Sequence, residues 1–465
     1  MLRFAAIGGL ALALACGRGG SSPPRPHDAP SASPRDAAAL ELPERPLGLP
    51  ALADYGWRKR PGQRTYREAR AAEARGDWPA VLAACERALA ADPGHLDARW
   101  LAAIALAHLN RLGDVLAPLD AAAAGDYGKW AAAALEHPAL QAFLVTPTGD
   151  AWHRRVDRDR ADYLAALARA LVVTSMGDLY AYDLQTTRWH RLTRTAGAVV
   201  AALAAPAAAH RIAYVTRDRA GKLAVGLVEL DTGRTTHPVD LGIVATATAP
   251  LAIAYGDKPT GFWVGTGGGA QAWRVLDDTG ALHALPAKLP RPTGAWLEVH
   301  AHTARLHRLP ANVAADWDDH ELASAVRVGS SNRVVSVPNA GMIDGSTLVW
   351  SPDRGHLAFV AVDEQCTQGK LASALFVADA ATGAVHQLGQ RGDGGHALEW
   401  LADGRLAIAD DRGLAIADVA GNQPTLSFDS ASLLAPRHRS RCAPEPAENS
   451  EPASEPEPSD PPSEN

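Results

Sequence analysis

The stretches LVWSPDRGHLAFVAV (residues 348–362) and LEWLADGRLAIAD (398–410) are two copies of one pattern. Trp350 and Trp400 lie 50 residues apart, and so do Asp353 and Asp403. In each copy a tryptophan is followed by a polar turn and then by a run of apolar residues, which is typical of strands joined by a tight turn. We therefore expect a repeating β-sheet unit with a period of about 50 residues.

The repeat extends, more faintly, over the second half of the chain. LAAPAAAHRIAYV (203–215) is a weaker copy, and an aspartate before a polar turn is a second marker. A period of about 40–50 residues with four strands each is typical of propeller blades. We expect six blades between residue 171 and about 430, with seven as the alternative, and 286–335 fits worst. The marker aspartates are Asp183, Asp231, Asp278, Asp379 and Asp418.

The best copy of this repeat resembles a known family. WSPDRGHLAF followed by LFVADAATGAVHQL is similar to the TolB-type repeat, a blade motif of bacterial envelope propellers, and the resemblance is specific over 348–419. The family motif runs Trp-Ser-Pro-Asp-Gly. Trp350, Pro352 and Asp353 match it, as do Trp400 and Asp403 in the second copy. Arg354 replaces the motif glycine, and we expect Gly355 to supply the flexibility instead.

The first half of the chain has a helical period. In RGDWPAVLAACERALAADPGH (75–95), apolar residues recur on one face of a helix that opens near Pro79. This segment resembles a tetratricopeptide repeat, a helix–turn–helix unit. We expect Trp78 to pack beside Ala88, and Pro93 to end the second helix. The residues at the family's positions are Gly76, Trp78, Val81, Cys85, Ala88 and Pro93, with Val81 a departure.

These patterns predict a multidomain α + β chain. A small α-helical hairpin-repeat domain is expected over 61–165, and an all-β, TolB-like propeller over 166–430. A weaker second helical unit covers 99–122. Residues 431–465 are expected to form a disordered tail, since its Pro, Glu and Ser residues offer little to bury. Its last part, 443–465, carries seven acidic residues and no basic one.

The N-terminus has the pattern of an export signal. MLRFAAIGGLALALAC places one arginine before a short apolar run that ends in small residues and Cys16. A cysteine at the cut site resembles the lipobox of bacterial lipoproteins, although Ala13 stands where that family usually has leucine. We expect a signal peptide over 1–15, and a lipidated Cys16 with a flexible tether over 16–60. Ordinary cleavage, with Cys16 nearby by chance, is the alternative.

This resemblance implies an exported protein that is lipid-anchored to a bacterial membrane and faces the periplasm or the cell surface. In such an oxidising compartment Cys366 and Cys442 are expected to form a disulfide, because both fall on loops at one face of neighbouring blades. Two free loop thiols are the rival interpretation. Cys85 lies at an apolar helical position and is expected to be a core residue.

The charged and glycine-rich motifs point to no defined chemistry. His300, His302 and His307, with the acidic stretch 316–321, could hold a metal or could simply face solvent, and we expect no metal site. VGTGGGAQAW (264–273) lacks the ending of a phosphate-binding loop. No cofactor is expected. Gly-x-Ser-x-Gly is absent, and few residues follow the last expected strand, so we also expect no enzyme activity.

Charge excludes one class of partner. The net charge is −7, and without 443–465 the chain is formally neutral, so it lacks the basic surface of a nucleic-acid binder. The leading hypothesis is a binding or scaffold module that meets envelope proteins through helical-repeat and propeller surfaces. A propeller enzyme of lyase or glycosidase type, with its active site in the central channel, is the alternative. A structural domain of a larger envelope complex is the third hypothesis.

Overall fold

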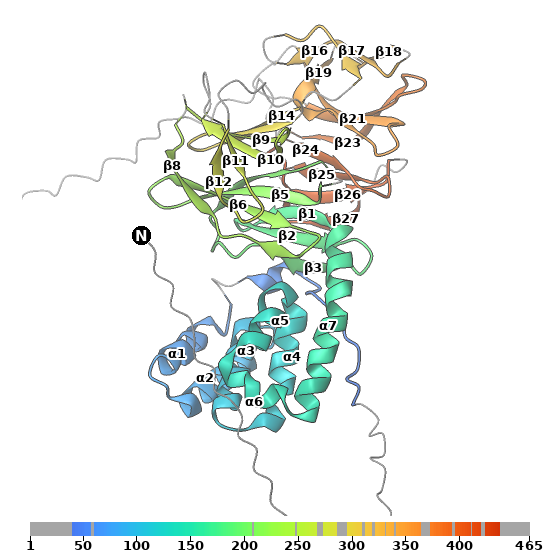
Figure 1. Cartoon of the computed structure of the whole chain (residues 1–465). Helices are drawn as coiled ribbons and strands as arrows, with labels where there is room; N and C mark the ends of the chain where they lie inside the picture. Colours follow the sequence, from blue (N-terminus) through green and yellow to red (C-terminus); the bar gives the residue numbers. More distant parts are fainter. Residues whose placement is uncertain are drawn as a thin grey trace, which may run out of the picture. The chain divides into compact units, whose positions relative to one another are not determined.

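The computed structural model shows a helical region followed by antiparallel sheets, so the α + β prediction is confirmed (Figure 1). The chain divides into a unit that ends at Glu41 and a second that begins at Leu42, and the description below concerns the second. The structure describes residues 40–56, 60–206, 209–246, 249–266, 273–285, 295–308, 312–318, 321–330, 332–338, 341–363, 373–392, 396–410, 412–419 and 424–437.

The helical region runs from Leu52 to Ala168, and consecutive helices pack against one another. Among the described residues no helix is both long and apolar enough to cross a membrane. The helices are η1 (Leu52–Tyr55), α1 (Gln63–Glu73), α2 (Trp78–Ala91), α3 (Leu96–His108), η2 (Leu112–Asp114), α4 (Leu116–Gly125), α5 (Tyr127–Glu136), η3 (Pro138–Leu140), α6 (Gln141–Leu144) and α7 (Pro147–Ala168).

Helix α2 shows how the sequence sets these boundaries. The Asp77 side chain accepts a hydrogen bond from the Ala80 backbone N–H, and Pro79 lies in the first turn, where its missing N–H costs little. The helix ends at Ala91, two residues before Pro93. Its buried face, which includes Val81 and Cys85, packs into a core made largely of alanine and leucine side chains.

The strands form six antiparallel sheets within the described residues. The number of blades stays a prediction, because one of the sheets has three short strands and others take in extra hairpins. The first three sheets are β28–β1–β2–β3, β4–β5–β6–β7 with β8 on β6, and β12–β11–β10–β9–β13–β14. The other three are β15–β17–β18, β16–β19–β21–β22–β23 with β20 on β21, and β24–β25–β26–β27.

The strands of the first three sheets are short. They are β1 (Leu171–Ser175), β2 (Asp178–Asp183), β3 (Arg188–Arg191), β4 (Val199–Ala204), β5 (Arg211–Arg217), β6 (Lys222–Glu229), β7 (Arg234–Thr235), β8 (Val239–Val244), β9 (Leu251–Asp257), β10 (Thr260–Thr266), β11 (Arg274–Leu276), β12 (Leu282–Ala284), β13 (Trp296–Val299) and β14 (Ala304–His307).

The later sheets are built from similar pieces. Their strands are β15 (Val313–Ala314), β16 (Leu322–Ala323), β17 (Ala325–Val328), β18 (Arg333–Ser336), β19 (Gly341–Asp344), β20 (Val349–Trp350), β21 (His356–Asp363), β22 (Ser373–Asp379), β23 (Val385–Gly392), β24 (Ala397–Trp400), β25 (Leu406–Asp410), β26 (Gly413–Ala417), β27 (Pro424–Phe428) and β28 (Ser432–Leu433), with the 3-10 turn η5 (Gly345–Thr347) before β20.

The last strand of the described chain joins the first sheet. In β28, Leu433 pairs with Val173 of β1 and Ser432 pairs with Thr174. The Ser175 hydroxyl adds a hydrogen bond of 2.7 Å to the Ser430 carbonyl. Residues about 255 positions apart are therefore joined in one sheet, which ties the end of the sheet region to its beginning.

The two repeat copies form the same turn, with one difference from our expectation. Asp353 accepts hydrogen bonds from the Ser351 hydroxyl and the Gly355 N–H. Arg354 itself adopts the left-handed conformation, with φ +58°, as does Gly404 in the second copy, with φ +84°. Gly355 does not compensate as expected. The backbone keeps the shape of the family turn and strains the arginine, because left-handed φ crowds its Cβ.

The turn markers also need a correction at two positions. The acids that cap these turns include Asp183 and Asp379, which accept bonds from the Thr186 and Thr382 hydroxyls. In LDDTG the capping acid is Asp277 and not Asp278, and in ELDTG the acid bound by the Thr232 hydroxyl is Glu229 and not Asp231. Asp278 and Asp231 pair instead with Arg211 and His210.

Candidate functional site

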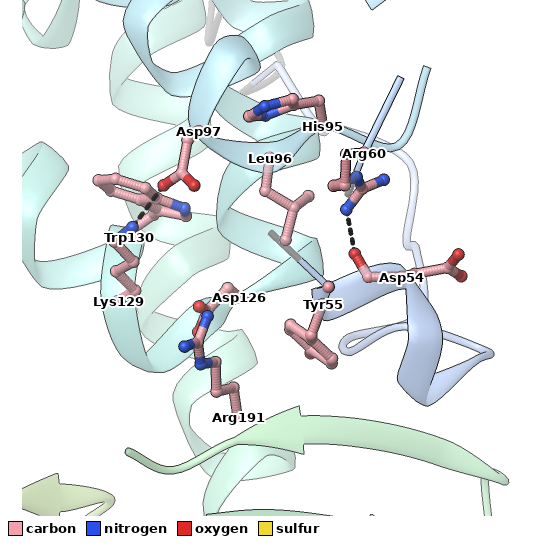
Figure 2. Close-up of a pocket in the computed structure, with 11 residues that line it drawn as sticks. Asp54, Tyr55, Arg60, His95, Leu96, Asp97, Asp126, Lys129, Trp130 and Arg191 are labelled. Carbon is pink, nitrogen blue, oxygen red and sulfur yellow. Dashed lines mark hydrogen bonds and ion pairs between the residues drawn. The ribbon is translucent and has the colours of Figure 1, made fainter. Parts of the chain in front are cut away.

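A polar junction joins the helical region to the first sheet, and Tyr55 lies at its centre (Figure 2). The Tyr55 hydroxyl lies 2.7 Å from the Gly125 carbonyl of α4 and 2.8 Å from the Trp189 carbonyl of β3. Burial raises the pKa of this phenol well above 10, so the group stays a neutral donor. Tyr55 thus contacts both regions at once, whereas the sequence pattern predicted a flexible tether at this position.

An ion pair spans the same junction. Asp126, between α4 and α5, pairs with Arg194, which follows β3, and the second contact of the pair, Nε to Oδ2, is 3.3 Å. Asp126 is 5% exposed. Burial by itself would lower the pKa of Arg194, but Asp126 outweighs it and raises the value. The Arg194 guanidinium therefore stays charged.

The other polar side chains of the junction pair within their own regions. Lys129 lies 2.5 Å from Asp97, and its ammonium lies 3.8 Å from the centre of the Trp130 ring. Arg60 bonds Asp92, with one contact at 2.7 Å. These groups and Arg191 surround a cavity of about 30 Å³. This volume holds a water molecule or two, and the contacts around it join the helical region to the first sheet.

A second cluster gathers the histidines that the sequence singled out. His307 Nε2 lies 3.1 Å from Glu298 Oε2, and its Nδ1 lies 3.6 Å from Glu321 Oε1. The His307 ring stacks on Trp296 with 4.6 Å between ring centres. His300 Nε2 lies 3.7 Å from the same Glu298 oxygen. We call Glu298, His300, His307 and Glu321 the β13–β14 cluster.

The β13–β14 cluster contains only some of the histidines and acidic residues that the sequence singled out. His302 is exposed, and Asp316 forms no ion pair with the described residues of the cluster, while residues 319 and 320 lie outside the described residues. Within the described part of the chain, no group of three His, Cys, Asp or Glu side chains is arranged to hold a metal ion. The cluster can exchange protons between carboxylates and imidazoles, which is the chemistry its residue types allow.

Trp78 packs against the helical core and also contacts the next helix. It is half-buried and stacks face to face on His108 of α3, with 3.7 Å between ring centres and 8° between planes. The expected neighbour was Ala88, within the same hairpin. The stacking partner comes from the next helix, because consecutive helices lie against each other.

The motif residues of the sheets serve as turn and contact residues. Trp400 Nε1 donates a hydrogen bond of 2.9 Å to the Val349 carbonyl, and this bond connects two neighbouring sheets. Asp403 bonds the Arg405 guanidinium at 2.7 Å. Trp350 pairs with Leu357, and Pro352 is in the turn that Asp353 caps. None of these side chains joins either site above, which is consistent with a structural role in the repeat.

Three of the four cysteines lie outside the described residues: Cys16, Cys366 and Cys442. The lipid anchor and the disulfide therefore stay predictions. Cys85 is a free, fully buried thiol in the helical core, and burial raises its pKa to about 12. At that pKa the thiol is protonated and unreactive at neutral pH.

Comparison with known proteins gives only distant likenesses. No family model matches the chain, and no curated protein matches it. Among solved structures, it is similar to an acylaminoacyl peptidase of Pyrococcus horikoshii, with 13% identity and a TM-score of 0.26 over 54% of this chain and 42% of that one.

Two further structures are similar to a comparable degree. One is a puromycin-hydrolyzing peptidase of Mycobacterium tuberculosis, with 16% identity and a TM-score of 0.24 over 49% of this chain and 37% of that one. The other is the tricorn protease, with 12% identity and a TM-score of 0.17 over 53% of this chain and 31% of that one. The chain spans less than half the length of each of the three.

One expectation is withdrawn on this finding. We expected no enzyme activity, and the comparison contradicts this expectation, because the three structures named above are peptidases or proteases by name. Likenesses this distant transfer no activity, substrate or residue role to this chain. Within the described residues, a serine hydroxyl meets a histidine ring: Ser373 Oγ lies 3.1 Å from His396 Nε2. The two residues are 5% and 7% exposed, so this pair is closed to a substrate.

Proposed function

We propose that this chain is an exported, lipid-anchored envelope protein that acts as a binding or scaffold module. In this proposal the helices α1 to α5 serve as a tetratricopeptide-like array and the sheets serve as propeller blades. Both architectures present extended surfaces to partners. The export pattern before Cys16 and the two copies at 348–362 and 398–410 support the proposal from the sequence.

The observation that carries the proposal is the junction. Asp126 and Arg194 pair across it, and the Tyr55 hydroxyl bonds to both sides. Buried polar contacts of this kind fix the geometry of two packed surfaces, since leaving either partner unpaired is costly. The helical region and the first sheet are therefore held together, as a scaffold with surfaces on both requires.

Pairing of β28 with β1 supports the propeller part of the proposal. Propellers join the end of the chain to the first blade, so that the ring does not open. Here the Leu433–Val173 and Ser432–Thr174 pairs place a strand from the end of the sheet region on the first sheet. The edge of β1 is thereby covered, which also protects it from pairing with another chain.

The test is photo-crosslinking in intact cells. A photo-reactive phenylalanine analogue replaces Val145, which is 84% exposed in the helical region, or Val334, which is 60% exposed in the sheets. We expect each position to give a discrete crosslinked product. The matched control places the same analogue at Arg158, an exposed polar position of α7 outside the proposed array.

The outcomes separate binding from chance encounter. The proposal holds if the analogue at position 145 or 334 captures a discrete product and if Asp126→Asn, which loosens the junction, lowers the amount of that product. It is overturned if both positions give only the diffuse background of the Arg158 control.

A second candidate function is an activity at the β13–β14 cluster, of the lyase or glycosidase type. Glu298 and Glu321 flank the His307 imidazole, and Arg305 lies 3.8 Å from Glu321. Two carboxylates near one site are what general acid–base cleavage of glycosides requires. The test is product release from a panel of neutral and uronic-acid polysaccharides. Glu298→Gln should abolish release and Asp231→Asn, an exposed control, should not; no release from any member would remove this candidate.

A further inference from the structure

A cleft of about 360 Å³ opens beside α7, separate from the junction cavity and from the β13–β14 cluster. We call it the α7 cleft. Three parts of the chain form it: the segment before Gly48, the second half of α7, and the β2–β3 hairpin. Its volume is within the range of small-ligand sites. The lining residues that matter here are Arg45, Asp159, Asp162, Arg169, Arg188 and His190.

One wall of the α7 cleft is fixed by an internal ion pair. Arg169 Nε and Nη2 each lie 2.7 Å from an oxygen of Asp183. Asp183 is fully buried and accepts two more bonds, from the Gln185 N–H and the Thr186 hydroxyl. Burial favours a higher pKa for Asp183, but the hydrogen bonds from Arg169, Thr186 and the Gln185 N–H, together with the Arg169 charge, outweigh burial and lower the value. This bidentate pair is satisfied and holds the hairpin to α7.

His190 is a buried polar group that its surroundings leave unsatisfied. It is 3% exposed, and its Nε2 has no hydrogen-bond partner in the described part of the chain. The ring meets Tyr163 edge to face at 5.5 Å. Burial lowers the pKa of His190 to about 4, so the imidazole is neutral at pH 7. A buried unpartnered nitrogen at the edge of a cleft is the kind of group that a bound molecule satisfies.

Charges of both signs face the α7 cleft, and three of them form no ion pair within 4 Å in the described part of the chain, although Arg155 and Arg45 lie near enough to act on Asp159, and Asp162 lies near enough to act on Arg169. Asp159 and Asp162 lie three residues apart on α7, so they share a helix face. Among the described residues, neither acid has a hydrogen bond or an ion pair within 4 Å. Arg188 donates a hydrogen bond of 2.8 Å to the Gly48 carbonyl. No carboxylate of the described residues lies within 4 Å of its guanidinium. Arg45 differs, because Asp120 lies 2.5 Å from it.

We propose that the α7 cleft binds a zwitterion with a free ammonium and a free carboxylate, of amino-acid or dipeptide size. Asp159 and Asp162 bind the ammonium, Arg188 binds the carboxylate, and His190 bonds a polar atom between them. Pro46, Leu47 and Ala165 provide apolar contact for the body of the ligand. A simple anion would leave the two acids repelling it, and a simple cation would leave Arg188 unpaired.

This inference goes beyond the proposed function, since a scaffold needs no small-molecule site. The two also fail separately: the scaffold is tested by capture of proteins at Val145 and Val334, and the α7 cleft by binding of purified small molecules.

The experiment is calorimetric titration of the full chain in detergent with four probes. They are alanyl-alanine, its N-acetyl form, its amide, and free alanine. We expect alanyl-alanine or alanine to bind with one site per chain. Masking either charge of the dipeptide should weaken binding at least about tenfold, because a charge-assisted hydrogen bond is lost. Free alanine binding as well as the dipeptide identifies an amino-acid site, and the dipeptide binding alone identifies a peptide site.

Variants assign each charge. The Arg188→Gln variant should bind alanyl-alanine no more tightly than the wild type binds its amide. The double variant Asp159→Asn, Asp162→Asn should bind alanyl-alanine no more tightly than the wild type binds its N-acetyl form. Arg160→Gln and Asp157→Asn, exposed on α7 and outside the α7 cleft, are the matched controls and should keep wild-type affinity. Melting curves establish that each variant is folded.

Three results would overturn the proposal. They are the absence of saturable binding with all four probes, equal affinity for capped and uncapped dipeptides, and equal loss in the control variants. The α7 cleft would then hold water only.

Discussion

Arg194 and Asp126 form an ion pair between a loop of the first sheet and the turn that joins α4 to α5, 68 residues earlier in the chain. The pair lies beside Tyr55, whose hydroxyl bonds one carbonyl from each region. Two independent contacts of this kind mean that separation of the helical region from the first sheet exposes several buried polar groups at once.

Asp126→Asn should therefore destabilise the protein. The change leaves Arg194 without its counter-ion in a partly buried place, and removal of one partner from such a pair costs about 1–3 kcal/mol. Urea unfolding followed by tryptophan fluorescence measures the difference. The control is Asp114→Asn, which breaks an exposed pair with Arg111 and should cost under about 1 kcal/mol. Equal costs for the two variants would contradict a special role of the junction.

His190 should make the protein sensitive to acid. Its pKa is about 4 in the folded state against an ordinary 6.5, so above pH 6.5 the imidazole is neutral in both states and contributes no pH dependence. As the pH falls from 6.5 to 4 the unfolded chain binds the proton first, and stability is lost. The loss approaches about 3 kcal/mol at pH 4.

The measurement is the difference in unfolding free energy between the wild type and His190→Asn, followed from pH 7.5 to pH 4. In this difference, the contribution of the carboxylates that titrate in the same pH range cancels, because both proteins carry the same carboxylates. We expect the wild type to lose more stability than the variant as the pH falls. Parallel curves would mean that the imidazole is protonated equally in both states.

Arg354→Gly should stabilise the protein. Arg354 has a left-handed φ of +58° at the position where the second copy has Gly404. A non-glycine residue in that conformation is strained by about 1 kcal/mol, so the glycine variant should gain about that amount despite its more flexible unfolded state. Thermal or urea unfolding measures it. Gly404→Ala is the reciprocal control and should destabilise, and a loss of stability in Arg354→Gly would show that the arginine side chain makes a compensating contact.

These turns show what the sequence can reveal. Local chemistry is readable, so Asp183, Asp353 and Asp379 were found as turn residues. Counting alone mistook Asp231 and Asp278 for the capping acids. The turn threonines bond Glu229 and Asp277 instead, and acids one or two residues apart cannot be told apart by spacing. The helical and sheet regions were found for the same reason: their periods of 3.6 and 2 residues are local.

The sites were not readable in this way. Tyr55 was assigned to a tether, since a Pro- and Ala-rich approach gives no periodic signal, and its two carbonyl partners lie 70 and 134 residues away. The α7 cleft combines residues 45, 159–169 and 183–190, whose proximity depends on how α7 meets the first hairpin. The histidines at 300 and 307 were noticed, but Glu298 reaches His307 through the pairing of β13 with β14, and Glu321 comes from a later part of the chain.

Replacement of Cys16 tests the anchor. If Cys16 carries lipid, more than one acyl chain holds the protein at a bilayer, and this makes the attachment stable. Cys16→Ser should release the protein in soluble form or leave it unprocessed, as measured by membrane fractionation and by the mobility of the band. Cys85→Ser, at a buried position in the helical core, is the control for loss of a thiol. Unchanged membrane partition and unchanged processing of Cys16→Ser would refute the lipoprotein proposal.

The stacking of Trp78 on His108 gives the last prediction. A ring that is half-buried and stacked on the next helix contributes less than a fully buried one, so Trp78→Ala should cost about 1–3 kcal/mol, below the 3–5 expected for a buried tryptophan. His108→Ala should cost less, because it removes a smaller ring. The double variant should show a coupling of about 0.5–1.5 kcal/mol, the range measured for aromatic pairs. Urea unfolding of the four proteins gives the coupling, with Trp78→Ala combined with His153→Ala, an exposed histidine of α7, as the uncoupled control. A coupling near zero for Trp78 and His108 would mean that the two rings do not stabilise each other.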